Sequence, residues 1–179
     1  MKKVCLSLLT LMLCTTLFSQ INKGQWLAGG TIGLESGKVG DTDASKFTSF
    51  EFNPDAGYFF IQNLAAGARV SFQTVKFKDQ DATNSFLFSP FVRYYFLPAG
   101  RRVNILADGS YGLGSMKNAE GSESFNQFAI AAGPAVFLSP NTALEFTLRY
   151  SSAGGDAFGG DDRLNNFGLN VGFQVHLGK

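Results

Sequence analysis

The sequence contains few of the residues that most enzymes and metal proteins rely on. Its 179 residues include 2 cysteines and 1 histidine. Cys5 and Cys14 both lie in the first apolar stretch, so the rest of the chain has no cysteine for a disulfide or a thiolate site. The 15 Lys and Arg residues balance 14 Asp and Glu residues. This balance lacks the basic excess of nucleic-acid-binding domains, so we expect no nucleic-acid partner.

Long hydrophobic runs are also missing, apart from one near the start. Met1-Lys2-Lys3 is followed by an apolar stretch over 4–18 and then by Ser19-Gln20. This order predicts a secretory signal peptide over 1–19, leaving 20–179 as one domain. A lipoprotein with its lipid on Cys14 is the alternative, but the residue before that cysteine is Leu13, where a small residue is required. No run of about 20 apolar residues exists, so no membrane-spanning helix is expected.

One pattern of alternating residues occurs twice and identifies the architecture. Segments 50–60 and 86–96 both alternate aromatic with other residues, contain a proline and end in an aromatic cluster, and 130–138 is a weaker copy. Period 2 indicates β-strands, and repeated strand-turn units indicate a meander of hairpins. In 50–60 the large apolar residues share one parity, while Glu51, Asn53 and Asp55 share the other. This arrangement is typical of a barrel that is apolar towards lipid and polar inside.

The whole chain after the signal peptide can be divided into such strands. We predict an all-β fold, an eight-stranded antiparallel up-and-down transmembrane β-barrel, with strands near 24–36, 47–60, 64–77, 85–97, 103–115, 125–138, 142–152 and 165–177. The connections alternate between tight turns and long segments rich in Gly, Asp, Ser and Asn. Pro54, Pro90 and Pro134 fall inside strands, where each removes a hydrogen-bond donor, so we expect a β-bulge at each.

These features resemble the small eight-stranded outer-membrane barrels of the OmpA/OmpX-like superfamily. The resemblance rests on the strand ends Tyr58-Phe59-Phe60 and Tyr94-Tyr95-Phe96, the phrase over 63–68 and the closing strand over 167–177. It implies location in the cell outer membrane, contact with membrane lipid, insertion by the barrel-assembly machinery and a monomer. It also implies a structural, envelope-integrity or adhesion role without a wide pore.

The charged residues of inward parity form the candidate functional cluster. Asp55 and Arg69 are nearly equidistant from the first tight turn and should face each other, and Arg93 and Asp108 are similarly related across the second. The inferred layer is Asp55–Arg69–Arg93–Asp108, with Glu145 and Arg149 on one face of the seventh strand. Eight strands leave no wide channel, and buried charges must pair, so this cluster predicts a polar plug. A gated narrow ion path is the alternative.

No catalytic, cofactor or metal site is expected, and we predict that the protein is not an enzyme. His176 is the only histidine, and its parity points inward near the end of the last strand. The glycine- and aspartate-rich segment over 154–162 is a candidate surface loop for an unknown ligand, through Asp156, Phe158, Asp161 and Asp162.

Three classes of function remain open from the sequence. The favoured one is a structural or surface-interaction barrel with exposed loops. The second is a small transport or conductance barrel. The third is a soluble periplasmic lipid-binding barrel, which would need an apolar interior and is disfavoured by the inward charges.

Overall fold

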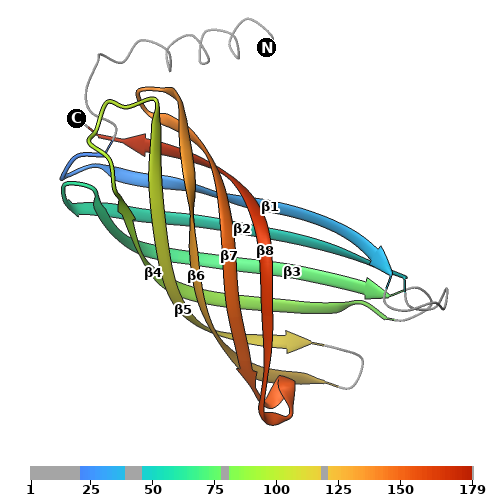
Figure 1. Ribbon diagram of the computed structural model, residues 1–179. Helices are drawn as coiled ribbons and strands as arrows, with labels where there is room; N and C mark the ends of the chain where they lie inside the picture. The colour runs from blue at the N-terminus through green and yellow to red at the C-terminus, as the bar shows by residue number, and fades with distance from the viewer. Residues whose placement is uncertain (1–20, 39–45, 78–80, 118–120, 179) are drawn as a thin grey trace, which may run out of the picture.

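The chain folds into a closed barrel of antiparallel strands in the order β1 to β8 (Figure 1). The computed structural model describes residues 21–38, 46–77, 81–117 and 121–178, so the predicted signal peptide lies outside the described residues. Among the residues described, no helix is long and apolar enough to span a membrane. The strands are β1 Trp26–Lys38, β2 Lys46–Ile61, β3 Leu64–Phe77, β4 Thr83–Tyr95, β5 Val103–Lys117, β6 Ser122–Ser139, β7 Thr142–Gly155 and β8 Gly160–Leu177.

The two faces of the strands have opposite character, as the period-2 pattern predicts. Phe52, Phe88 and Leu148 point outward and keep 40%, 50% and 54% of their surface exposed. Asp55, Arg93 and Glu145 point inward and are at most 7% exposed. A soluble protein would bury the first set and expose the second. The arrangement is therefore that of a barrel whose outer surface faces lipid.

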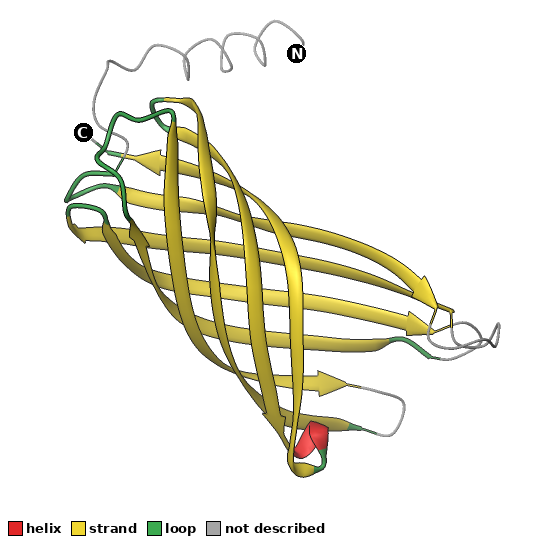
Figure 2. Cartoon of the chain, in the orientation of Figure 1, coloured by secondary structure: helices red, strands yellow, loops and turns green. Residues whose placement is uncertain are grey.

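The two ends of the barrel differ in their connections. At one end, called here the tight-turn end, β2–β3, β4–β5 and β6–β7 are joined by short turns, and the described chain begins and finishes there (Figure 2). The opposite end, called the hairpin end, carries the other connections. At Asn63 the backbone φ is 67°, which fits the first tight turn because asparagine tolerates the left-handed region.

The strands reach further towards the hairpin end than the sequence predicts. The segment 152–163 was expected to be a long loop, but only the short 3₁₀ turn η2, Asp156–Phe158, separates β7 from β8. Ser152 pairs with Asn165 and Gly154 with Arg163, so the ladder continues through the polar segment. Gly, Ser and Asn indicate loops because they disfavour half-buried strands, but a strand projecting beyond lipid can be polar on both faces.

The expected bulges at the prolines are absent. Pro54 stays in register with Gly30, Pro90 with Ala68 and Pro134 with Ile105, and no register shift occurs at any of the three. Each proline instead pairs with the preceding strand and has no register partner on the following strand. The residue before each proline lacks a partner there as well, so two pairs are lost at each site. Losing two pairs while keeping the register preserves the alternation of faces on both sides, which a bulge would disturb.

The seam between β1 and β8 is closed along only part of its length. Pairing runs from Trp26↔Leu177 to Thr31↔Gly172, and no pair joins the described remainder of β1 to β8. Figure 1 shows these strands together near the termini and apart towards the hairpin end. Gly30, directly before the last pair, has a φ of 152°, which L side chains rarely adopt. A Cβ at Gly30 would also collide with the backbone of Asn53. Glycine therefore allows β1 to change direction where the seam opens.

The assignment of the outer face can be tested on two neighbouring residues of β7. Leu148→Arg should impair assembly by about 2–4 kcal/mol, because it places a charge in the apolar band near the middle of the strand. Thr147→Ser, one residue away and inward, should cost much less. Folding yield, read from the gel mobility of unboiled samples, measures both variants. Equal losses would mean that the faces are misassigned.

Candidate functional site

The interior of the barrel holds a layer of ion pairs that we call the charged layer, formed by Asp55, Arg69, Arg93, Asp108 and Glu145. Arg69 donates to both carboxylate oxygens of Asp108 at 3.1 Å and to Asp55 Oδ2 at 3.2 Å. All five residues are less than 10% exposed. Such charges are stable away from water only when they are paired and hydrogen-bonded, which is the case here.

Arg93 is the centre of the charged layer. Its Nε donates to Asp108 Oδ2 at 3.1 Å, its Nη1 lies 3.1 Å from Glu145 Oε2, and its Nη2 lies 3.6 Å from Asp55 Oδ2. One planar guanidinium thus links carboxylates on β2, β5 and β7, which lie around the lumen. Arginine suits this position because its donors point in several fixed directions.

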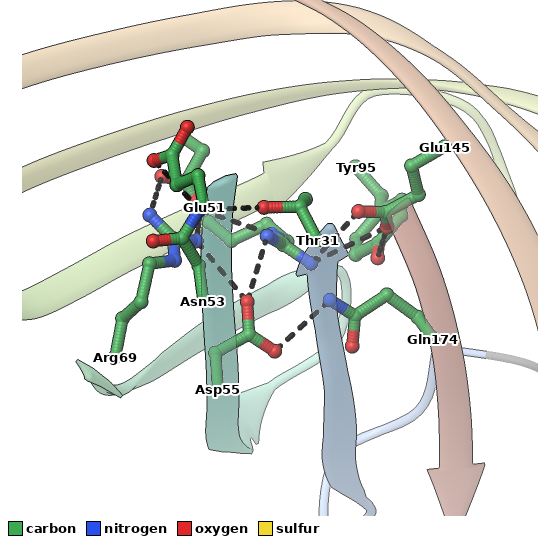
Figure 3. Close-up of polar contacts among 10 residues, drawn as sticks. Thr31, Glu51, Asn53, Asp55, Arg69, Tyr95, Glu145 and Gln174 are labelled. Carbon is green, nitrogen blue, oxygen red and sulfur yellow. Dashed lines mark hydrogen bonds and ion pairs between the residues drawn. The ribbon is translucent and has the colours of Figure 1, made fainter. Parts of the chain in front are cut away.

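Neutral side chains complete the layer. The hydroxyl of Tyr95 donates to Glu145 Oε1 at 2.8 Å, and Gln174 Nε2 donates to Asp55 Oδ1 at 2.9 Å (Figure 3). Both residues are missing from the cluster predicted from the sequence. Tyr95 belongs to an aromatic run that was interpreted only as the end of a strand. Its position two residues after Arg93 nevertheless gives it the same inward parity. Gln174 has inward parity on β8, but it is uncharged, and the predicted cluster contains only charged residues.

Phe91 provides a platform under both arginines. The guanidinium carbons of Arg69 and Arg93 lie 4.9 Å and 5.4 Å from its ring centroid, within cation–π range. The ring has room because the inward positions beside it are Gly57 and Gly67. A Cβ at these glycines would meet the Phe91 Cζ at 3.1 Å and 2.8 Å. The small residues of β2 and β3 thus determine where the aromatic ring, and with it the arginines, can lie.

The order of charges differs from the layer drawn from the sequence. Asp55 and Arg69 are register partners, as are Arg93 and Asp108. Arg69, however, is opposite Ser89 and not Arg93, so the arginines are offset along β4 and both reach Asp108 and Asp55. In a tilted barrel, residues at one height are not register partners, which explains the difference. Acidic and basic groups can then alternate.

The remaining predicted charge, Arg149, lies outside the charged layer. Its Nη2 donates to Gln127 Oε1 at 3.0 Å, and it makes no ion pair with any carboxylate in the described residues. Arg149 lines a cavity of about 300 Å³ that occupies the hairpin half of the lumen, called here the vestibule. It also lines a cavity of about 30 Å³ beside Arg69 and Arg93. Arg149 therefore lies at the floor of the vestibule, above the charged layer.

The lumen towards the tight-turn end is filled by an apolar layer. Ile21, Leu27, Phe59 and Tyr95 are fully buried there with His176. The His176 ring lies 5.6 Å from Phe59, 5.9 Å from Tyr95 and 5.5 Å from Phe137. Neither ring nitrogen has a hydrogen-bond partner within the described residues. His176 therefore acts as packing among aromatic rings, without the carboxylate or hydroxyl neighbour that acid–base catalysis uses.

The candidate loop residues divide between the surface and the vestibule. Asp156 is exposed and accepts a hydrogen bond from Ser124 Oγ at 2.7 Å. Phe158 turns inward, packs edge-on against Phe125 at 6.0 Å and lines the vestibule. Asp161 and Asp162 belong to β8, and their side chains lie outside what the structure describes. No group of three or more His, Cys, Asp or Glu residues in the described part of the chain could hold a metal ion.

Comparison with known proteins gives the same architecture. The model of the outer membrane protein beta-barrel domain family matches residues 5–174. Among solved structures, Neisserial surface protein A is 15% identical with a TM-score of 0.58, covering 86% of this chain and 97% of its own. OprG from Pseudomonas aeruginosa is 9% identical with a TM-score of 0.53, covering 89% and 99%. No curated protein matches by sequence.

The family match establishes the cell outer membrane as the location and membrane lipid as the surroundings of the barrel. It rules out the soluble periplasmic barrel considered from the sequence. The prediction that the protein is not an enzyme is corrected, because a matching structure is described as the outer membrane enzyme PagL. That structure is 10% identical with a TM-score of 0.46, covering 84% of this chain and 97% of its own, and assigns no reaction here.

The contacts of the three interior arginines predict an order of stability effects. Arg93→Ala should lower the free energy of unfolding most, by about 3–5 kcal/mol, because it leaves several buried carboxylates poorly compensated. Arg69→Ala should cost less, since Arg93 still reaches Asp108 and Gln174 still reaches Asp55. Arg149→Ala should cost least. Urea unfolding in lipid vesicles measures all three, and a larger loss for Arg149→Ala than for Arg93→Ala would contradict the geometry.

A double-mutant cycle tests the pairing within the layer. The combined change Asp55→Ala with Arg69→Ala should cost less than the sum of the single changes, because it leaves no orphaned partner at that contact. Additive costs would show that Asp55 and Arg69 do not interact in the folded barrel.

Proposed function

The chain belongs to the family of outer membrane protein beta-barrel domains, and from this membership we propose that it works as a sealed barrel with a structural or surface-interaction role. The barrel does not conduct solutes and acts through its hairpin end. It is a monomer and is inserted by the barrel-assembly machinery. The observation that carries the proposal is Arg93, whose guanidinium joins carboxylates from three strands across the lumen.

Two features support the absence of conduction. The charged layer fills the middle of the lumen, and the cavity beside it is only about 30 Å³, the volume of one water molecule. Below it, the fully buried side chains of Phe59, Tyr95 and His176 close the tight-turn end. An ion would have to displace both the ion pairs and the aromatic layer to pass.

The orientation of the barrel follows from the usual arrangement of such proteins, with short turns in the periplasm and long hairpins outside. We therefore place the tight-turn end in the periplasm. The vestibule and η2 then face the cell exterior. The larger of the two described lumenal cavities is then accessible from outside, which favours interaction with the surroundings over passage into the cell.

Conductance measurements test the sealed barrel directly. The purified protein in planar bilayers should give no steady current, and vesicles containing it should not swell in small sugars, whereas an open porin prepared in parallel should do both. A stable current that changes in Arg93→Ala or Arg69→Ala would support the transport alternative and contradict the sealed-barrel proposal.

Cysteine labelling tests the orientation, because the segment after the predicted signal peptide has no cysteine of its own. Lys117→Cys and Arg101→Cys lie near the two ends of β5, and both positions are exposed. A membrane-impermeant maleimide should label Lys117→Cys in intact cells and Arg101→Cys only after the outer membrane is opened. The reverse pattern would invert the topology.

A further inference from the structure

We propose that the vestibule binds an amphipathic anion, with its acidic head at Arg149 and its single apolar tail leaving through the open β1–β8 seam. The vestibule holds about 300 Å³, the size at which small-molecule pockets begin. This binding proposal does not require the orientation proposed above. The orientation determines only which leaflet of the membrane supplies the tail.

The head-group site is built around an arginine with unused donors. A guanidinium carries five N–H donors, and within the described residues Arg149 uses one of them, in its hydrogen bond to Gln127. The other arginines of the lumen are committed to carboxylates, but Arg149 is not. Glu51 lines the same vestibule and accepts instead from Asn53 Nδ2 at 2.8 Å. A carboxylate or phosphate head could take the free donors of Arg149 in the charge-assisted geometry that arginine favours.

One part of the vestibule wall is apolar. Leu87 and Phe125 form a buried cluster there, against which Phe158 of η2 packs. A polar floor below an apolar wall fits a molecule with one charged end and one apolar end. Free sugars and inorganic ions would match only the floor.

The seam provides a lateral route for the tail. No pair joins β1 to β8 beyond Thr31↔Gly172 in the described residues, and none of the β1 side chains that the structure describes, over 26–33, lines the vestibule. The outward side chains next to the unpaired stretch are apolar and exposed, with Ile32 at 62%, Leu169 at 69% and Phe167 at 67%. The seam therefore opens within the lipid-facing band and not above it. A tail lying in this opening would occupy the position that the missing β1–β8 pairs leave uncovered.

Side-chain NMR of the barrel in lipid nanodiscs tests the head-group site. The Arg149 Nε–H signal, assigned by its loss in Arg149→Gln, should shift saturably with decanoate and with decyl phosphate. Decanol, with the same tail and no charge, should bind about tenfold or more weakly, because a hydrogen bond to a charged group is lost. No shift with either anion, or an equal shift with decanol, would overturn the site.

Two matched glycine variants locate the binding. Gly168 lines the vestibule and Gly109 lies on the outer face, and a Cβ added at either meets nothing within 4 Å. Gly168→Leu should abolish the decanoate shift by filling the vestibule, while Gly109→Leu should leave it unchanged. Normal gel mobility of both variants confirms that they fold. Equal effects of the two changes would assign decanoate to the lipid surface and reject the vestibule.

A cross-link across the seam tests the route of the tail. Ile32→Cys and Val171→Cys would be the next partners after Thr31↔Gly172, so a short bis-maleimide can join them by adding each thiol across one of its double bonds. Joining them should abolish binding of decanoate but leave butyrate, which has too short a tail to reach the seam, bound at Arg149. Unchanged decanoate binding would show entry from the mouth and reject the lateral route. If the barrel conducts and also binds decanoate, the sealed-barrel proposal is wrong and the proposal of binding in the vestibule stands.

Discussion

The interior of this barrel is organised by one guanidinium. Arg93 contacts Asp55, Asp108 and Glu145, and two of these carboxylates are also held by Arg69. Two cations facing three carboxylates leave one negative charge in excess within the layer. Neutral donors offset it: Tyr95 donates to Glu145 and Gln174 to Asp55. Removing water from such a group is tolerable only because every carboxylate has at least two donors.

The outer membrane imposes this solution on the sequence. An outer face of aromatic and aliphatic residues leaves no place outside for polar side chains, and alternation sends every second residue inward. The lumen must then be packed with polar residues whose sizes fit a narrow bore. Gly57 and Gly67 supply the space that Phe91 occupies, and Phe91 in turn supports both arginines. The same constraint turns the sole histidine inward at the tight-turn end, where it packs among rings.

The sequence predicts the parts of this arrangement that depend on local rules. The period-2 pattern predicts the strands and which residues face outward or inward. The equal distances of Asp55 and Arg69 from a tight turn predict that they face each other, and they are register partners in the structure. Contacts across the bore could not be predicted from the sequence. The link from Arg93 to Glu145 joins β4 to β7, which share no register, and depends on strand tilt and side-chain length. Composition gave wrong predictions at the hairpin end, where polar residues form strand in place of loop. It also did so at the prolines, where the ladder loses two pairs without a bulge.

The two halves of the molecule are held by different interactions, and this determines where it can change. At the tight-turn end, paired strands, buried rings and ion pairs constrain one another, and Gly29 and Gly172 bring β1 and β8 backbones into close contact. Towards the hairpin end, no pair joins β1 to β8 beyond Thr31↔Gly172 in the described residues. The lumen there holds a cavity floored by an arginine without a carboxylate partner among those residues. Low contact density and exposed backbone edges mark the regions of a protein that open most easily. The tight-turn half thus holds the barrel together, while the hairpin half is the part whose conformation can change most readily.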